Sequence, residues 1–404
     1  MTEKIYLKNP YLMEVNAKVI ENKFEDNKFY VKLNRTIFYP HMSGGQPRDK
    51  GYIDDIEVYD VYEQNNEIIH VLRDMPNKDI VKLSIEWDTR FKHMQQHTGQ
   101  HILSASFDKL LNSKTLSFHM GQDINYIDID TQCLTQNDID KIESFANKIV
   151  FSNFEIQNYI INKEECSKLP LRNLPTVDED IRIVEINKLD FSPCGGTHHR
   201  STAEVGIIKI INWYKTKKYH RVEFVCGVSA LNDYKEKNYL SQKISKILQV
   251  NQNKAIETIS RINTDIDNLK KSNTILKTKL LSYKTNWLIN SSVKYKNIKI
   301  CSDIVDDFDL NEIRKLISNV TNYNNYVVII GIESEDKSEI LLGKSDNVSI
   351  DIKGLFDTIL TKINGKGGGT PSICQGGCND PKIVYEALEF GLSLIKEEID
   401  RKEN

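Results

Sequence analysis

Four side chains of the sequence have the types and the spacing of metal ligands. His97 and His101 stand four residues apart, and Cys194 and His198 repeat that spacing much later in the chain. Three imidazoles and one thiolate are the donors that tetrahedral zinc prefers. On a helix, positions i and i+4 share a face, whereas the two glycines between the second pair favour a tight turn. The sequence therefore predicts one Zn²⁺ site built from two distant segments.

The histidine motif also limits the chemistry that such a site performs. The residue after His97 is Thr98, so the motif lacks the glutamate that serves as general base in HExxH metallopeptidases. This absence counts against cleavage of peptide bonds, and an activated ester is an easier target. Four protein ligands close a tetrahedral shell, as in structural zinc sites, whereas catalysis needs an open or a fifth position. The sequence leaves this choice open.

The composition excludes several classes of protein. The net charge of the 404-residue chain is only -3, which excludes a strongly basic nucleic-acid binder but not a local basic patch. Two clusters qualify, at Lys215–Arg221 and at Lys362 with Lys366, and a solvated surface is the alternative for each. No apolar run spans a membrane and the N-terminus is polar, so we expect a cytoplasmic protein. Seven scattered cysteines favour free thiols and metal ligation over disulfides.

The patterns of apolar residues predict an α+β fold in four parts. Alternation at Lys28–Leu33 and Glu57–Tyr62 indicates strands on either side of a loop rich in Gly and Pro. A helix over Thr89–Leu111 places Met94, Thr98, Ile102 and Ala105 on one face, and the strands expected after it are Ile181–Ile186, Val205–Ile211 and Arg221–Val225. The four parts are a small β-barrel at 1–88, an α+β zinc-binding domain at 89–228, a helical linker at 229–290, and an α/β domain at 291–404.

The linker has the pattern of a coiled coil. It contains no Gly or Pro, and apolar residues step by three and four from Ile259 to Trp287, with Asn273 at one core position. Asn251–Asn253 interrupts the pattern, so a helical hairpin and one rod are both open. The seam either pairs within the chain or forms a homodimer, and the part at 291–404 is the other candidate for dimerisation. In the last part, Val327–Ile330 predicts a buried strand, and Asp380 before Pro381 predicts a helix start.

Longer strings around the ligands resemble a known family. Met94–Ser104 (MQQHTGQHILS) and Pro193–His198 (PCGGTH) are similar to the editing domain of alanyl-tRNA synthetase and to the free-standing alanyl-tRNA editing proteins. The strings Thr36–Pro40, Ser117–Gly121 and Arg221–Gly227 agree. The resemblance implies that the four ligands bind zinc and that the domain hydrolyses Ser-tRNA(Ala), and sometimes Gly-tRNA(Ala).

The resemblance also assigns further residues. It implies that Thr36 senses the seryl hydroxyl. Gln46 joins the four ligands in the expected catalytic set, and Gly44 and Gly45 are expected to contact the substrate, because donors from this loop would stabilise the developing negative charge. An ordinary strand threonine and simple turn chemistry are the alternatives. Near the C-terminus, a glycine-rich string resembles the tRNA-binding domain of the synthetase, which makes its members candidate substrate contacts: Lys366, Gly367 and Gly368.

The expected function is editing in trans of tRNA(Ala) that carries serine or glycine. Too few residues precede Thr36 for an aminoacylation domain, so we do not expect this chain to charge tRNA. Two other interpretations stay open. One is a zinc-stabilised tRNA- or RNA-binding protein without catalysis, and the other is a deacylase of another mischarged tRNA.

Overall fold

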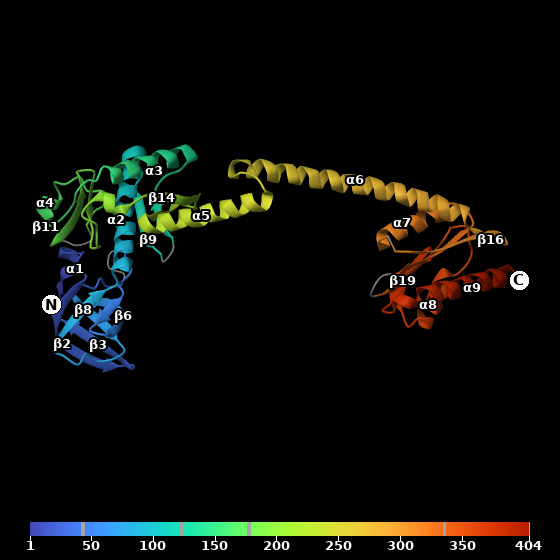
Figure 1. Ribbon diagram of the computed structural model, residues 1–404, viewed down its shortest axis with the longest axis horizontal. Helices are drawn as coiled ribbons and strands as arrows, with labels where there is room; N and C mark the ends of the chain where they lie inside the picture. Colours follow the sequence, from blue (N-terminus) through green and yellow to red (C-terminus); the bar gives the residue numbers. More distant parts are fainter. Residues whose placement is uncertain (42–44, 122–123, 176–178, 307, 334–336, 404) are drawn as a thin grey trace. The chain divides into compact units, whose positions relative to one another are not determined.

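The chain forms two compact units, Met1–Gln252 and Asn253–Asn404 (Figure 1). The computed structural model describes residues 1–41, 45–121, 124–175, 179–306, 308–333 and 337–403. The mixed α+β character that the sequence predicts is confirmed. None of the described helices combines the length and the apolar content that a membrane span requires.

The N-terminal strands form a closed barrel with an apolar interior. Asn27 and Asn66 each follow another residue with positive φ, which gives the two tight turns between antiparallel strands their left-handed backbone. Val31, Leu33 and Leu83 are fully or almost fully buried inside. The barrel runs in the order β2 (Glu14–Glu25), β3 (Lys28–Leu33), β7 (Glu67–Leu72), β6 (Ile56–Gln64), β5 (Gly51–Ile53) and β8 (Ile80–Ile85), and β1 (Glu3–Lys4), α1 (Ile5–Lys8) and β4 (Arg35–Thr36) complete this part.

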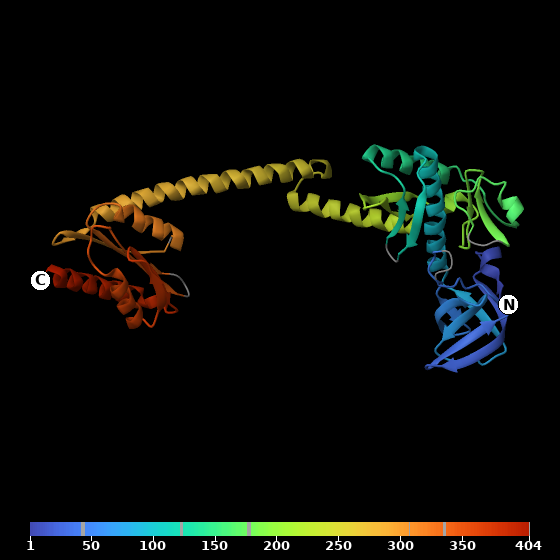
Figure 2. The ribbon, with the colours of Figure 1, turned by 180° about the vertical axis from the view of Figure 1, so that it is seen from behind.

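Helix α2 (Trp87–Leu111) begins at the barrel and continues into the next layer (Figures 1 and 2). Its first turns are fixed by Arg90, a fully buried side chain that forms an ion pair with Asp49 and donates to the carbonyl oxygens of Pro10 and Ile37. The boundary that the sequence places at residue 88 therefore falls inside a continuous helix.

The predicted apolar face of α2 is buried against a four-stranded antiparallel sheet and helix α3 (Gln136–Phe151). Met94, Thr98 and Ile102 have no exposed surface, which confirms the helical spacing. The sheet has the order β14 (Ile208–Lys215), β15 (His220–Cys226), β10 (Asn125–Ile129) and β9 (Thr115–Met120).

A three-stranded sheet carries the second ligand pair. The strand predicted at Ile181–Ile186 is confirmed, but the one predicted at Val205–Ile211 is wrong at its start. A capping box between Ser201 and Glu204 begins a short 3₁₀ helix, and Gly206 at φ +69° turns the chain, so the strand starts only at Ile208. The sheet has the order β11 (Ile156–Ile161), β12 (Ile181–Ile186) and β13 (Asp190–Pro193), with α4 (Lys163–Cys166) and η1 (Thr202–Val205) beside it.

The predicted linker consists of two helices. α5 (Gly227–Leu248) ends at Gln249, which has a positive φ, and a 3₁₀ turn η2 (Gln252–Lys254) precedes α6 (Ala255–Asn290). The interruption expected at Asn251–Asn253 is thus confirmed, and one continuous rod is excluded.

The second unit contains a six-stranded sheet with helices on both faces. The end of α6 packs with α7 (Leu310–Thr321) on one face, and α8 (Ile352–Lys362) with α9 (Val384–Glu403) covers the other (Figure 1). Asp380 caps the short turn η3 (Pro381–Ile383), so the regular helix begins after the predicted start. The sheet has the order β16 (Val293–Tyr295), β17 (Ile298–Val305), β18 (Tyr326–Glu333), β19 (Ser338–Lys344), β21 (Ile373–Cys378) and β20 (Lys366–Gly369). Among its described strands, β17 and β18 pair in parallel and the other neighbours are antiparallel.

Candidate metal centre

The four predicted ligands converge on one point. Candidate donor atoms of His97, His101, Cys194 and His198 all lie within 4.8 Å of one another. The Cys194 Sγ is 3.3 Å from His97 Nε2 and 3.7 Å from His198 Nε2. Metal–ligand bonds of about 2.0–2.3 Å in a tetrahedron separate neighbouring donors by about 3.3–3.8 Å. The donor types and both separations fit a zinc ion.

Two helical turns and one tight loop produce this geometry. His97 and His101 project from the same face of α2, with their ring centroids 5.4 Å apart. The loop after β13 approaches them so closely that a Cβ on Gly196 would lie 2.1 Å from His97 Cε1, while one on Gly195 would meet no atom within 4 Å. Only the second glycine of the loop is therefore required by the close approach.

The far side of each helical histidine is held by an oxygen. His97 Nδ1 lies 3.2 Å from Gln46 Oε1, and His101 Nδ1 lies 3.1 Å from Asp190 Oδ2. An amide or carboxylate oxygen accepts a hydrogen bond at this distance, so Nδ1 carries the proton and Nε2 faces the metal position. Asp190 also accepts hydrogen bonds from Arg172 and Ser192. Asp190 and Arg172 are not predictable from the sequence, because no spacing rule connects them to the ligands.

The charges of the cluster support metal binding. Burial alone would raise the pKa of the Cys194 thiol, but His97 and His198 hold that pKa well below its usual value. Burial opposes charge on His101, yet hydrogen bonds to Asp190 and Cys194 raise its pKa to about 9. Without a metal, the site is thus a thiolate beside an imidazolium, and a divalent cation would replace the proton.

Gln46 contacts the ligand His97 on the side of its ring that faces away from the other ligands. Its side chain is almost fully buried, and Oε1 accepts from the Thr197 backbone N–H at 3.1 Å as well as from His97. Its Nε2 donates to Thr197 Oγ1 at 2.9 Å. These contacts connect the barrel loop to the CGGTH segment. Of the two glycines predicted beside it, Gly44 lies outside the described residues, and Gly45 has φ +79° and lies close to Phe118.

Thr36 lies in the barrel part, fully buried, with its hydroxyl bonded on two sides. The hydroxyl is 2.8 Å from His70 Nε2, and His70 Nδ1 is 3.2 Å from the Val31 carbonyl oxygen. Because a carbonyl only accepts, Nδ1 carries the hydrogen, and Nε2 accepts a hydrogen bond that the Thr36 hydroxyl donates. Burial lowers the pKa of His70 to about 4, so the ring stays neutral. The Phe38 N–H donates to the same hydroxyl, so one lone pair of the Thr36 Oγ1 can still accept a hydrogen bond.

Two other side chains organise the surroundings of the ligands. Arg182 donates to the carbonyl oxygens of Cys194 (2.7 Å) and Gly196 (3.0 Å), so it fixes the tight loop. His199 turns away from the ligand set, with Nδ1 3.2 Å from the hydroxyl of Tyr11. Arg182 is not predictable from the sequence, because only the pairing of β12 with β13 brings it next to the loop.

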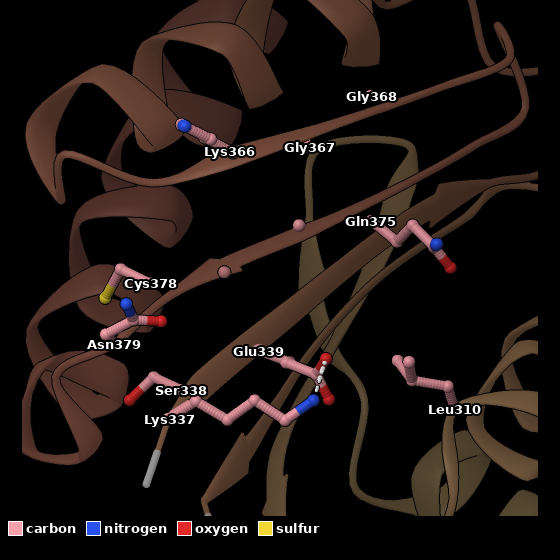
Figure 3. A pocket seen from close by; sticks show the side chains of 12 residues that line it. Leu310, Lys337, Ser338, Glu339, Lys366, Gly367, Gly368, Gln375, Cys378 and Asn379 are labelled. Carbon is pink, nitrogen blue, oxygen red and sulfur yellow. Dashed lines mark hydrogen bonds and ion pairs between the residues drawn. The ribbon is translucent and has the colours of Figure 1, made fainter. Parts of the chain in front are cut away.

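The candidate tRNA contacts of the second unit line a pocket (Figure 3). Lys366, Gly367 and Gly368 lie on β20 of the β20–β21 hairpin. A Cβ on Gly367 would lie 2.4 Å from the Gln375 carbonyl oxygen, whereas one on Gly368 would meet nothing within 4 Å. Gly367 is therefore required by the hairpin itself, whereas the space next to the Gly368 Cα is open.

Comparison with known proteins shows similarity over the whole chain. The chain is 33% identical over 405 residues to the alanyl-tRNA editing protein AlaX-L of Pyrococcus horikoshii, covering 96% of this chain and 98% of that protein. It is 28% identical over 363 residues to the alanyl-tRNA editing protein Aarsd1-A of Xenopus laevis, covering 87% and 85%. Residues 181–223 match the family described as the threonyl and alanyl tRNA synthetase second additional domain.

Longer relatives and one solved structure are also similar. The alanine–tRNA ligase of Methanococcus maripaludis is 26% identical over 397 residues, and the match covers 94% of this chain but only 42% of the ligase. The crystal structure of the C-Ala domain from Aquifex aeolicus alanyl-tRNA synthetase matches 26% of this chain at 19% identity, with a TM-score of 0.25.

Proposed function

Because the chain belongs to the alanyl-tRNA editing protein family, we propose that it hydrolyses the aminoacyl ester of mischarged tRNA(Ala) in trans. The observation that carries this proposal is the convergence of His97, His101, Cys194 and His198 on one buried point. These residues lie within the aligned length of a relative whose name states the editing of alanyl-tRNA.

The donor set fits Zn²⁺, which, when bound, supplies a Lewis acid that polarises an ester carbonyl. The chain's own residues do the rest. Gln46 and Asp190 orient the two helical imidazoles, and Arg182 holds the loop that carries Cys194. Gln46 and the backbone of Gly45 are the proposed donors to the ester, and the contacts of Gln46 with Thr197 and His97 give it a positioning role as well.

Selection of serine would depend on Thr36. Its single remaining lone pair accepts a hydrogen bond, which a seryl hydroxyl donates and an alanyl methyl group does not. A site built to bond a hydroxyl disfavours the analogue without it by about 10⁴-fold. Correct Ala-tRNA(Ala) is spared on this account, and Gly-tRNA(Ala), which also lacks the hydroxyl, is the poorer of the two substrates.

The second unit would bind a part of the tRNA other than the reacting ester. Lys366 brings a positive charge to the pocket, and the open backbone of Gly368 allows close approach of phosphate or ribose. We assign these residues, with Gly367, to tRNA binding.

The long helix α6 would pair with a second copy of the chain. Its predicted seam is exposed along much of its length: Leu269 and Leu276 are 68% and 64% exposed. Apolar steps of three and four with Asn273 at one core position are typical of helices that pair with themselves in a fixed register. Sedimentation analysis should give a dimer, and Leu269→Lys with Leu276→Lys should give a monomer.

A structural role of zinc is the second candidate. Four protein ligands with His97, His101 and His198 only 1–3% exposed are typical of a closed site. In that case the chain would bind tRNA without hydrolysing it, and loss of metal would unfold the domain.

One assay separates the candidates. The purified protein is incubated with Ser-tRNA(Ala), Gly-tRNA(Ala) and Ala-tRNA(Ala), with Cys194→Ala as the control. Release of serine ahead of alanine, lost in the variant, supports editing. A tRNA of another specificity that carries a wrong amino acid is the fourth substrate. Absence of release from all four, with tRNA binding intact, supports the structural role, and release from the fourth alone would assign the enzyme a different substrate.

A further inference from the structure

The sheet that packs on α2 has a second face, which carries a row of planar side chains. Side chains alternate along β9, so Phe118 faces inward, 5.6 Å from the His97 ring, and the next residue, His119, projects from the opposite face. β9 is the last strand in the sheet order. A ligand could therefore pass from the outer face of the sheet to the inner face by crossing the edge at β9 alone.

The planar groups on the outer face are stacked and fixed. The His119 ring stacks on Tyr126 of β10, with centroids 5.0 Å apart and planes inclined by 27°. The Arg221 guanidinium of β15 lies 3.7 Å from the Tyr126 ring and 5.9 Å from that of Tyr219. Asp128 accepts two hydrogen bonds from Arg221, at 2.8 and 3.0 Å, which fixes the guanidinium plane. Imidazole, phenol and guanidinium thus form one continuous stack.

Positive charge gathers at one end of this stack. The turn between β14 and β15 carries Lys217 and Lys218, both exposed, directly before Tyr219. Because Asp128 is neutralised by Arg221, it does not cancel the charge of these lysines. Stacking platforms next to flexible cations are the features that single-stranded nucleic acids bind, whereas a duplex hides the faces of its bases.

We propose that this outer face binds the unpaired nucleotides that precede the terminal adenosine of tRNA. A base stacks on the outer face of the exposed His119 ring, whose other face rests on Tyr126, and the phosphates meet Lys217 and Lys218. The strand then passes around β9, and its aminoacylated end reaches the ligand cluster on the inner face. This inference rests on the proposed function for the identity of the RNA, but the surface itself is defined by contacts outside the metal centre.

Binding of uncharged RNA tests the proposal without any hydrolysis. The probe is an acceptor-stem hairpin ending in ACCA, with 2-aminopurine at the first unpaired adenosine, because its fluorescence falls when it stacks. The full chain should quench the probe. His119→Ala together with Tyr126→Leu should abolish the quenching and weaken binding about 10–100-fold. His119→Ala alone, at an exposed site, should give part of this loss with the fold retained, as checked by circular dichroism.

The lysines have their own signature. Lys217→Ala with Lys218→Ala should lower the slope of log affinity against log salt by about 1.4, because each phosphate contact to a single strand contributes about 0.7. The matched control is Lys141→Ala with Lys148→Ala on α3, which removes two exposed charges elsewhere and should leave the slope unchanged.

Several results would overturn the proposal. These are absence of quenching by the wild-type chain, equal quenching by the His119→Ala, Tyr126→Leu variant, and equal affinity for a blunt-ended stem without ACCA. Failure of the proposed function looks different. Quenching that depends on the stack, in a protein that releases no amino acid, would retain this surface and reject the hydrolase. Normal KM for Ser-tRNA(Ala) in His119→Ala would retain the hydrolase and reject the surface.

Discussion

Asp190 connects the metal centre to the rest of its sheet, and its replacement by Asn tests that connection. The carboxylate accepts hydrogen bonds from His101 at 3.1 Å and from Arg172 at 2.9 Å, and its side chain is almost fully buried. Asp190→Asn keeps the shape but removes the charge that favours the Nδ1–H tautomer of His101. Loss of such a partner typically weakens metal affinity 10–100-fold, equivalent to about 1–3 kcal/mol.

The same substitution has a second, independent consequence for stability. Burial alone would raise the pKa of Asp190, but Arg172 and His101 lower it from 3.8 to about 2. A lowered folded-state pKa stabilises the fold above the unfolded value, and this contribution is lost as the pH falls through about 2. It amounts to about 2 kcal/mol at neutral pH. Asp190→Asn should therefore unfold at lower denaturant concentration even without zinc.

The assay is competition for zinc with a chromophoric chelator, combined with urea unfolding of the metal-free chain. Asp128→Asn is the matched control, because Asp128 is also a buried partner of an arginine but lies on the other sheet. It should lose stability and keep its zinc affinity. If Asp190→Asn binds zinc as tightly as the wild-type chain, the carboxylate does not orient His101 and this account of the site is wrong.

Three further predictions concern the metal centre and Thr36. Gly196→Ala should bind much less than one zinc per chain by elemental analysis, because its Cβ would lie 2.1 Å from the ring of the ligand His97. Gly195→Ala should bind zinc normally. Full zinc occupancy in Gly196→Ala would contradict the close approach of the loop to His97. Zinc affinity, measured by chelator competition, should rise about tenfold per pH unit below the His101 pKa of about 9 and level off above it. The reason is that His101 must lose its proton before the metal binds. A flat pH profile would contradict the release of a proton from His101. Thr36→Val should lower the ratio of seryl to alanyl ester hydrolysis by about 100-fold or more with unchanged zinc content. Thr36→Ser should keep the ratio. An unchanged ratio in Thr36→Val would show that the Thr36 hydroxyl, which is bonded to His70, does not select serine.

The parts of the fold that the sequence predicts well are those with strong periodicity. The β3 strand at Lys28–Leu33 and the helix that carries His97 were expected from alternation and from i, i+4 spacing, and both are present. The strand expected from Val205 begins late, because a local capping box and Gly206 override the apolar pattern. Short-range side-chain bonds to the backbone are difficult to weigh against periodicity in a single sequence.

Only the four metal ligands of the site are predictable from the sequence. The ligands follow a spacing rule, whereas Asp190, Arg172 and His70 reach their partners through contacts between segments distant in sequence. Gln46 was singled out as a donor to substrate, but its amide contacts His97 and Thr197, which a sequence cannot show. The roles of Gln46 and Thr36 towards substrate stay predictions.

The continuity of α2 limits how this protein can be dissected. A cut at residue 88 would place Asp49 in one fragment and Arg90 in the other, although the two are a fully buried pair. An orphaned buried charge of this kind typically costs about 3–5 kcal/mol, a large share of the stability of a whole domain. Neither fragment should persist alone, and a chimera that exchanges the barrel must carry the first turns of the helix with it. Engineering of this protein should therefore treat residues 1–252 as indivisible.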